Sequence, residues 1–198
     1  MTSSRKPWPM RWVVLIIVLF LIPYTYLTLH FRKPGPAYQP YQDAKEREHL
    51  SQRGYRRVTI TAIRPTESRL APDGAGVTEA AQALPEDLRT AFIVPPLLPA
   101  AIGGVFAPAE LRGATPYAIE FACLLADDAQ QLSGCALYIK GSDVYIVPTF
   151  ERLPNGLTAR TRQNLIALTF PPDALAPGGY QIILVGVSGS KRWRLQVH

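Results

Sequence analysis

Ala136-Leu-Tyr-Ile-Lys-Gly-Ser-Asp-Val-Tyr-Ile-Val147 is the stretch that decides the fold of this 198-residue chain. It consists of two apolar runs, rich in aromatic and β-branched side chains, on either side of the polar turn Lys140-Gly-Ser-Asp143. Such side chains suit a pleated surface, and glycine supplies the backbone freedom that a tight turn requires. The stretch therefore predicts a β-hairpin.

Alternation of apolar and polar residues extends this β pattern in both directions along the chain. Val58, Ile60 and Ala62 alternate with threonines, and a period of two predicts a strand with one buried face. Further strands are expected over residues 117–123, 165–170, 180–185 and 193–197. Six or seven short strands without βαβ spacing predict a mainly β domain over 55–198. Its expected architecture is an antiparallel immunoglobulin-like β-sandwich with one or two short helices.

The loop Leu175-Ala-Pro-Gly-Gly-Tyr-Gln-Ile182 resembles the Gly-x-Tyr corner of immunoglobulin-like sandwiches, with Gly178 and Tyr180 as the corner residues. In that corner, a tyrosine at the start of a late strand donates a hydrogen bond back across the connecting loop. The resemblance is confined to this loop. It implies a fold class and no function.

The middle of the chain contains the candidate helices of the domain and an apolar, proline-rich connection. Residues 78–84 and 85–92 are the candidate helices, the second with Pro85 in its first turn. Residues 93–108 contain too many prolines for a regular helix or a central strand, yet their apolar side chains are costly to expose. They either cover an edge of the sandwich or form a docking patch for a membrane protein. The candidate docking residues are Leu97, Leu98, Ile102, Val105 and Phe106.

Residues 12–31 predict a single transmembrane helix. They begin with 18 uncharged residues, which as a helix span most of a hydrocarbon layer roughly 30 Å thick. A cleavable signal peptide is the competing interpretation, but its best cleavage site, Gly35-Pro-Ala37, follows two cations and contains a proline. A buried helix is disfavoured because so short a chain cannot surround a uniformly apolar surface. We therefore expect an uncleaved anchor in the cell inner or plasma membrane, in contact with membrane lipid.

The flanks of the apolar segment suggest its orientation. Cations precede and follow it, so the positive-inside rule alone does not decide. Acidic residues among the later cations, the length of the domain and a pair of cysteines favour a cytoplasmic N-terminus. The expected order is a cytoplasmic tail (1–11), the membrane helix (12–31), a proline-rich and charged tether (32–54) and a periplasmic or extracellular domain (55–198).

The net charge of +6 does not indicate nucleic-acid binding. Residues 1–54 contain eight Lys or Arg against three acidic residues, and residues 55–198 contain 13 against 12, a balance of +1. The excess of cations therefore flanks the apolar segment, where cations meet lipid headgroups. A nucleic-acid partner is not expected.

Cys123 and Cys135 are the only cysteines, and they are expected to form a disulfide. Their strands would be joined by the polar loop 126–134, and antiparallel pairing of the two strands would bring the thiols together. Closing a loop of this size stabilises a domain by about 3 kcal/mol in the chain-entropy model. The alternative is a pair of buried thiols that act as small hydrophobic side chains.

The sequence contains no catalytic or cofactor-binding motif that we recognise. Its three histidines lie at the membrane edge, in the tether and at the last residue, so none is placed to orient a nucleophile. No phosphate loop, dinucleotide fingerprint or metal-ligand spacing occurs. We therefore expect no cofactor and no metal, and a non-enzymatic accessory protein whose partner is another membrane or envelope protein. The alternatives are a membrane-tethered domain that binds a glycan or other envelope polymer, and a membrane-tethered hydrolase.

Overall fold

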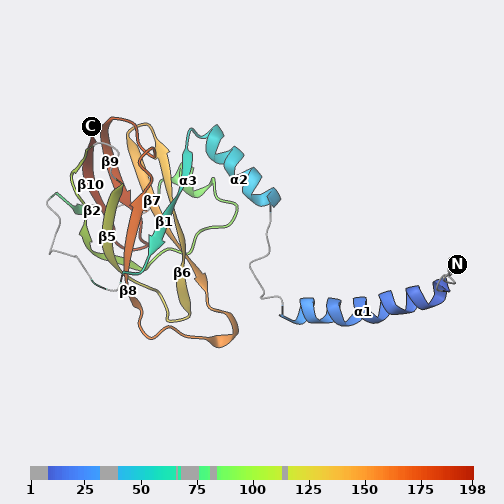
Figure 1. Cartoon of the computed structure of the whole chain (residues 1–198). Helices are drawn as coiled ribbons and strands as arrows, with labels where there is room; N and C mark the ends of the chain where they lie inside the picture. The colour runs from blue at the N-terminus through green and yellow to red at the C-terminus, as the bar shows by residue number, and fades with distance from the viewer. Residues whose placement is uncertain (1–8, 32–39, 66, 68–75, 81–83, 113–115) are drawn as a thin grey trace. The chain divides into compact units, whose positions relative to one another are not determined.

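The computed structural model describes residues 9–31, 40–65, 67, 76–80, 84–112 and 116–198 (Figure 1). The chain divides into two compact units, Met1–Pro40 and Tyr41–His198.

The N-terminal unit contains helix α1, Met10–Phe31. Its apolar sequence favours a helix, because a helix pairs its backbone groups internally except where Pro23 lacks an amide donor, and no part of Met10–Thr28 is buried by protein. The hydroxyl groups of Thr25 and Thr28 donate hydrogen bonds to carbonyl oxygens one turn earlier, so they also present no unpaired donor. As predicted, this helix is long and apolar enough to cross a membrane.

The C-terminal unit is mainly β, as predicted. Its elements are α2 (Pro40–Gln52), β1 (Arg56–Ile63), β2 (Thr78–Ala80), α3 (Glu86–Arg89), β3 (Ala101–Phe106), β4 (Glu110–Leu111), β5 (Tyr117–Leu124), β6 (Gln130–Lys140), β7 (Asp143–Arg152), a 3-10 turn (Pro154–Gly156), β8 (Gln163–Phe170), β9 (Gly178–Leu184) and β10 (Ser190–Val197).

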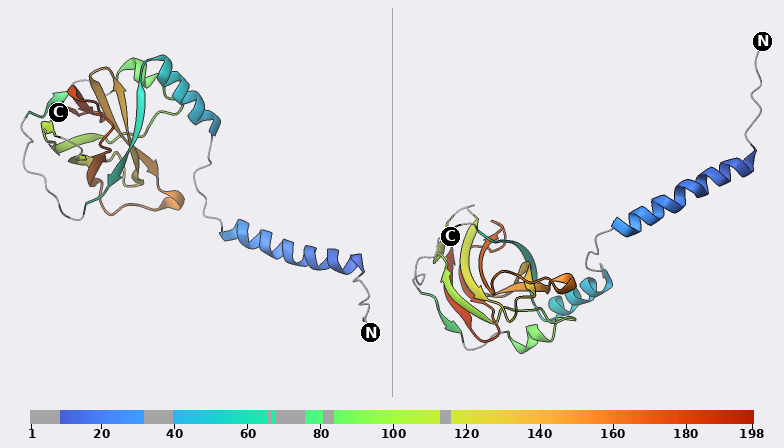
Figure 2. Two further views of the ribbon diagram at one scale, coloured as in Figure 1. Left: turned by 45° about the horizontal axis from the view of Figure 1, so that its top comes forward. Right: turned by 90° about the horizontal axis from the view of Figure 1, so that it is seen from below.

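The strands form one open, curled sheet in the order β2-β10-β9-β7-β6-β1-β8-β5-β3, and β4 pairs with β10 (Figure 1 and Figure 2). Strand β1 links the two halves of the curled sheet, because its first half pairs with β6 and its second half pairs with β8. The two ends of the sheet approach each other where the amide of Ile102 donates to the carbonyl oxygen of Gly189. The predicted immunoglobulin-like sandwich is not confirmed, since β1 joins the strands into a single sheet. Pairing is also not wholly antiparallel, because β7 and β9 run parallel.

The hairpin predicted at 136–147 is confirmed as β6 and β7, with Lys140 paired to Asp143. Gly141 has φ 61°, the left-handed conformation that the turn requires. The helix predicted over 78–84 is wrong in its described part, since Thr78–Ala80 form β2 and pair with the edge of β10; residues 81–83 lie outside the described residues. The helix predicted over 85–92 is confirmed as the shorter α3.

Two hydrophobic clusters cover opposite faces of the sheet. The larger fills the concave inner face, where Ile119, Phe121, Ile146 and Leu168 are fully buried. The smaller lies on the outer face of the β6–β7 hairpin, under α2 and α3, and we call it the covered face. Its buried residues are Leu50, Tyr55, Leu88, Ala91, Ala136, Tyr138, Val147 and Val185. Burial on both faces explains why the hairpin runs are continuously apolar.

Part of the segment predicted as a tether belongs to the compact unit. Leu50 of α2 is buried on the covered face, and Glu46 of α2 forms an ion pair with Arg57 of β1 at 3.2 Å. Residues 32–39 lie outside the described residues. A helix with so few apolar residues has too weak a hydrophobic periodicity to reveal its packing.

Candidate functional site

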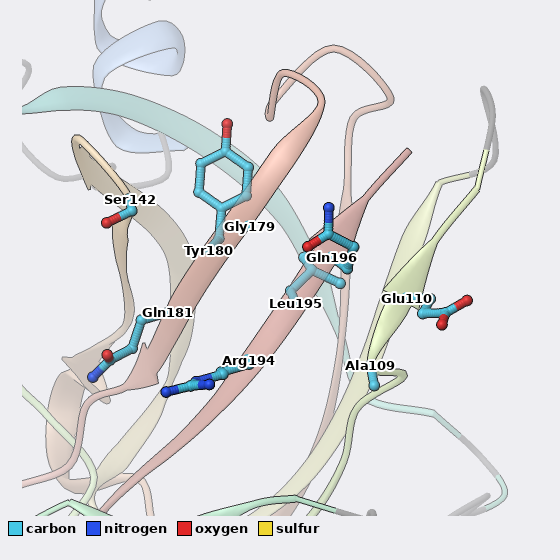
Figure 3. A pocket seen from close by; sticks show the side chains of 9 residues that line it. All are labelled: Ala109, Glu110, Ser142, Gly179, Tyr180, Gln181, Arg194, Leu195 and Gln196. Atoms are coloured by element: carbon cyan, nitrogen blue, oxygen red, sulfur yellow. The ribbon is translucent and has the colours of Figure 1, made fainter.

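A groove runs over the exposed face of β9 and β10. Arg194 lies directly opposite Gln181, and Gln196 lies opposite Gly179. One part of the groove encloses about 490 Å³ (Figure 3) and a second part about 460 Å³, and both parts include Ala109, Gln181 and Arg194. We call the whole the β10 groove. Its lining residues are Gly76, Thr78, Ala109, Glu110, Ser142, Gly179, Tyr180, Gln181, Arg192, Trp193, Arg194, Leu195 and Gln196.

The groove lies at a gap in the edge of the sheet. On this side, β10 pairs with β2 at 190–192 and with β4 at 196–197, so Arg194 falls between the two partners. The amide of Gln196 donates to Ala109 on this edge, and by the two-residue period of a strand the N–H and C=O of Arg194 face the same way. The amide of Gln181 points to the other side, toward Ser142. The main chain of Arg194 thus borders the gap without a backbone partner among the described residues.

The charge of the groove is positive. The side chain of Arg194 is exposed and forms no ion pair with any residue that the structure describes. Arg192 donates a long hydrogen bond of 3.4 Å to Thr78. Glu110 is paired with Arg112 at 2.6 Å, and its carboxylate points away from Arg194 (Figure 3). Arg194 is therefore available to an anionic ligand.

The walls of the groove are held in place by hydrogen bonds to the core. The hydroxyl of Tyr117 donates to the carbonyl oxygen of Pro108 at 2.7 Å and accepts from the indole of Trp193 at 3.0 Å. These bonds fasten the segment before Ala109 to β5 and β10. On the opposite wall, the hydroxyl of Tyr180 donates to Ala176 at 3.0 Å. Of the two residues of the predicted Gly-x-Tyr corner, Tyr180 lines the groove and Gly178 does not.

A second surface differs from the groove because most of its side chains are apolar. It is the outer face of β3, β5 and β8, which we call the open face, and its residues are half-buried or exposed. Leu124 and Phe106 retain 38% and 36% of their surface, and a shallow hollow of about 460 Å³ lies beside Leu124. The residues of the open face are Ala101, Gly103, Phe106, Ala118, Glu120, Ala122, Leu124, Gln163, Leu165, Ala167 and Thr169.

The structure separates the five candidate docking residues. Ile102 and Val105 are buried in the inner cluster, and Leu98 packs against the covered face, so these three stabilise the domain. Leu97 is partly exposed and pairs with Phe150 of β7, while Phe106 belongs to the open face. The sequence missed the other members of the open face because alanine and leucine on the polar side of a strand are common.

The predicted disulfide is absent, because Cys123 and Cys135 are both free. Strand β5 pairs with β3 and β8, and β6 pairs with β7 and β1, so the expected hairpin between the two cysteine strands does not form. Burial raises the pKa of the Cys123 thiol to about 11, and burial also raises the pKa of Cys135. Both thiols are therefore protonated at neutral pH and poorly nucleophilic.

A polar cluster joins α3 to the sheet beside the covered face. The hydroxyl of Tyr55 donates to Asp87 at 2.9 Å, and the ammonium of Lys140 donates to the same carboxylate at 2.5 Å. The hydrogen bond from Lys140 lowers the pKa of Asp87, whereas burial and the Asp87 carboxylate raise the pKa of Tyr55. The three side chains satisfy one another's hydrogen-bonding groups, so the cluster holds α3 against the sheet. The described residues contain no group of three His, Cys, Asp or Glu that could hold a metal ion.

No known protein family, curated protein or solved structure matched this chain. Its function therefore has to be inferred from its own residues.

Proposed function

We propose that this chain is a non-enzymatic, single-pass membrane protein that presents its β domain outside the cytoplasm and binds another membrane or envelope protein there. Helix α1 is the anchor, and the open face is the docking surface. The observation that carries the proposal is the open face itself, on which Leu124, Phe106 and several alanines stay half-buried or exposed on the outer side of β3, β5 and β8.

The chemistry of the open face favours a protein partner over lipid. Glu120 is its one charged residue, and it contains no lysine or arginine. A surface that rests on anionic headgroups usually carries cations, whereas the centre of a protein interface is depleted of charge. The small side chains of Ala118, Ala122 and Ala167 leave the strands accessible to close packing by a partner's apolar side chains.

The docking proposal is tested with a photo-crosslinking residue at Leu124 of the full chain in its native membrane. A matched probe at Arg47, on the exposed side of α2, is the control. We expect a discrete crosslinked protein from position 124 only, and we expect Ala122→Arg to abolish it because a bulky charge then stands in the interface. Equal crosslinking from both positions, or crosslinking that survives Ala122→Arg, would refute the open face as the docking site.

The orientation is tested separately, by adding protease to intact spheroplasts. With the domain outside the cytoplasm, residues 55–198 are digested without lysis. Protection of the domain until the membrane is broken would reverse the proposed topology, and release of a soluble domain by the cells would contradict the anchor.

The second candidate function is ligand binding by the same tethered domain. It is favoured by the β10 groove. There Arg194 forms no ion pair with any residue that the structure describes, and hydrogen bonds to Tyr117 hold one wall of the groove in place.

A further inference from the structure

We propose that the β10 groove binds an acidic oligosaccharide, with Arg194 and Arg192 pairing with sugar carboxylates and Gln181 and Gln196 bonding sugar hydroxyls. The proposal deepens the ligand-binding candidate above, and it does not depend on the open face or on a protein partner.

The two arginines give the groove a preference for anionic ligands. Arg192 and Arg194 are two residues apart on one face of β10, which spaces their attachment points by roughly 7 Å. A guanidinium group presents a planar fork of donors that matches a carboxylate. Because Glu110 is already paired with Arg112, its charge does not neutralise Arg194.

The neutral groups between and beside the arginines suit sugar hydroxyls. Gln181 and Gln196 each present a donor and an acceptor side by side, and Ser142 adds a hydroxyl at the end of the groove. Their side chains line the same hollow as the ring of Tyr180, whose hydroxyl is bonded to Ala176 (Figure 3). A hydroxyl-rich ligand can therefore satisfy several polar groups at once.

Glycine at 179 creates the space for this arrangement. A Cβ atom at that position would lie 3.3 Å from Oε1 of Gln196, so any larger residue displaces the glutamine side chain. The end of a glutamine side chain is flexible, so the displacement would reshape the groove at little cost to folding.

The shape of the groove argues against two other ligand classes. An enclosed small-molecule site buries most of its ligand, whereas this groove is open and leaves one side of a ligand in water. A peptide that adds a strand needs several residues of free edge, but β2 and β4 leave only a short gap at Arg194. An extended, hydroxylated and anionic chain fits both the shape and the charge.

The probe for the test is an oligogalacturonate of defined length, titrated calorimetrically into the full chain in nonionic detergent. The same oligomer with its carboxylates methyl-esterified is the matched ligand control. Arg194→Gln removes one of the two arginine charges of the groove, and Arg160→Gln removes the charge of an exposed arginine outside the groove. Gly179→Val fills the groove without altering any charge.

We expect the wild-type chain and Arg160→Gln to bind the acidic oligomer equally, with an affinity that falls as salt rises. Arg194→Gln, Gly179→Val and esterification of the ligand should each weaken binding about tenfold or more, because each removes a charge-assisted hydrogen bond or the space for it. Circular dichroism should show unchanged melting for both groove variants.

Three results would overturn the proposal: no binding by the wild-type chain, equal losses in Arg194→Gln and Arg160→Gln, or equally tight binding of poly-L-glutamate. The first denies the site, the second indicates unspecific charge, and the third indicates an acidic peptide ligand. Crosslinking from position 124 should be unaffected by Arg194→Gln, so failure of this proposal and failure of the docking proposal are distinguishable.

Discussion

The covered face and the open face lie on the same outer side of one curled sheet, yet only the first is buried. Ala136 of β6 is 4% exposed beneath the helical segments, whereas Ala122 of β5, also on an outward position, is only half-buried. The strands themselves are similar, and the difference lies in the connecting segments, because α2, α3 and Leu98 pack on one face. The second layer of a sheet is therefore decided by the loops and helices between its strands.

The largest effect is expected from Ala136→Arg, compared with Ala122→Arg. A charge at Ala136 has no partner within the covered face, so we expect a loss of about 3 kcal/mol or more in the free energy of unfolding. At Ala122 the arginine can extend into water, and the loss should stay within about 0.5 kcal/mol. Denaturant unfolding of the full chain in detergent measures both. Similar losses at the two positions would mean that the open face is covered after all.

A smaller loss is expected from Leu88→Ala, with Leu124→Ala as its counterpart. Leu88 of α3 is fully buried, so its truncation should cost about 2–4 kcal/mol through lost contacts and a cavity. Leu124 already exposes 38% of its surface, so its truncation should cost less than about 1 kcal/mol. Denaturant unfolding of the full chain measures both losses in the free energy of unfolding. A ratio of the two losses near one would contradict the difference in burial between the two faces.

The smallest effect on stability is expected from the ion pair between Asp87 of α3 and Lys140. Because Lys140 lowers the pKa of this carboxyl in the folded state, the pair stabilises the domain above the ordinary aspartate pKa, and the stabilisation disappears as the pH falls through the lowered value. Both side chains are partly exposed, so the contribution should be below about 1 kcal/mol.

Asp87→Asn is the corresponding variant. The wild-type chain should be slightly more stable at neutral pH, and the difference should vanish in acid. Melting curves of the wild-type chain and of Asp87→Asn, recorded from acidic to neutral pH, measure this difference in stability. A constant difference at all pH values would show that the ion pair with Lys140 is not its source.

Several features of the fold could be predicted from local patterns. The hairpin at 136–147 follows from its apolar runs and the glycine turn, and the alternation around Tyr117 and Phe121 correctly identifies the buried side of β5. Period two determines which side chains share a face. It does not determine which strands become neighbours. The alternation therefore could not predict that β5 pairs with β8, that β1 pairs with two different strands, or that Cys123 is free.

The candidate sites show the same division between local and long-range information. The sequence by itself determined that Arg192, Arg194 and Gln196 share the exposed side of a half-buried strand and that residues 12–31 form an apolar helix, because both depend on residues close together in the chain. Only the tertiary structure decided that Gln181, Ala109 and Gly76 come to lie beside Arg194, and that Leu50 and Leu88 cover one outer face while Leu124 stays uncovered. These contacts join segments far apart in the sequence, where strand pairing and burial, and not local pattern, determine the neighbours.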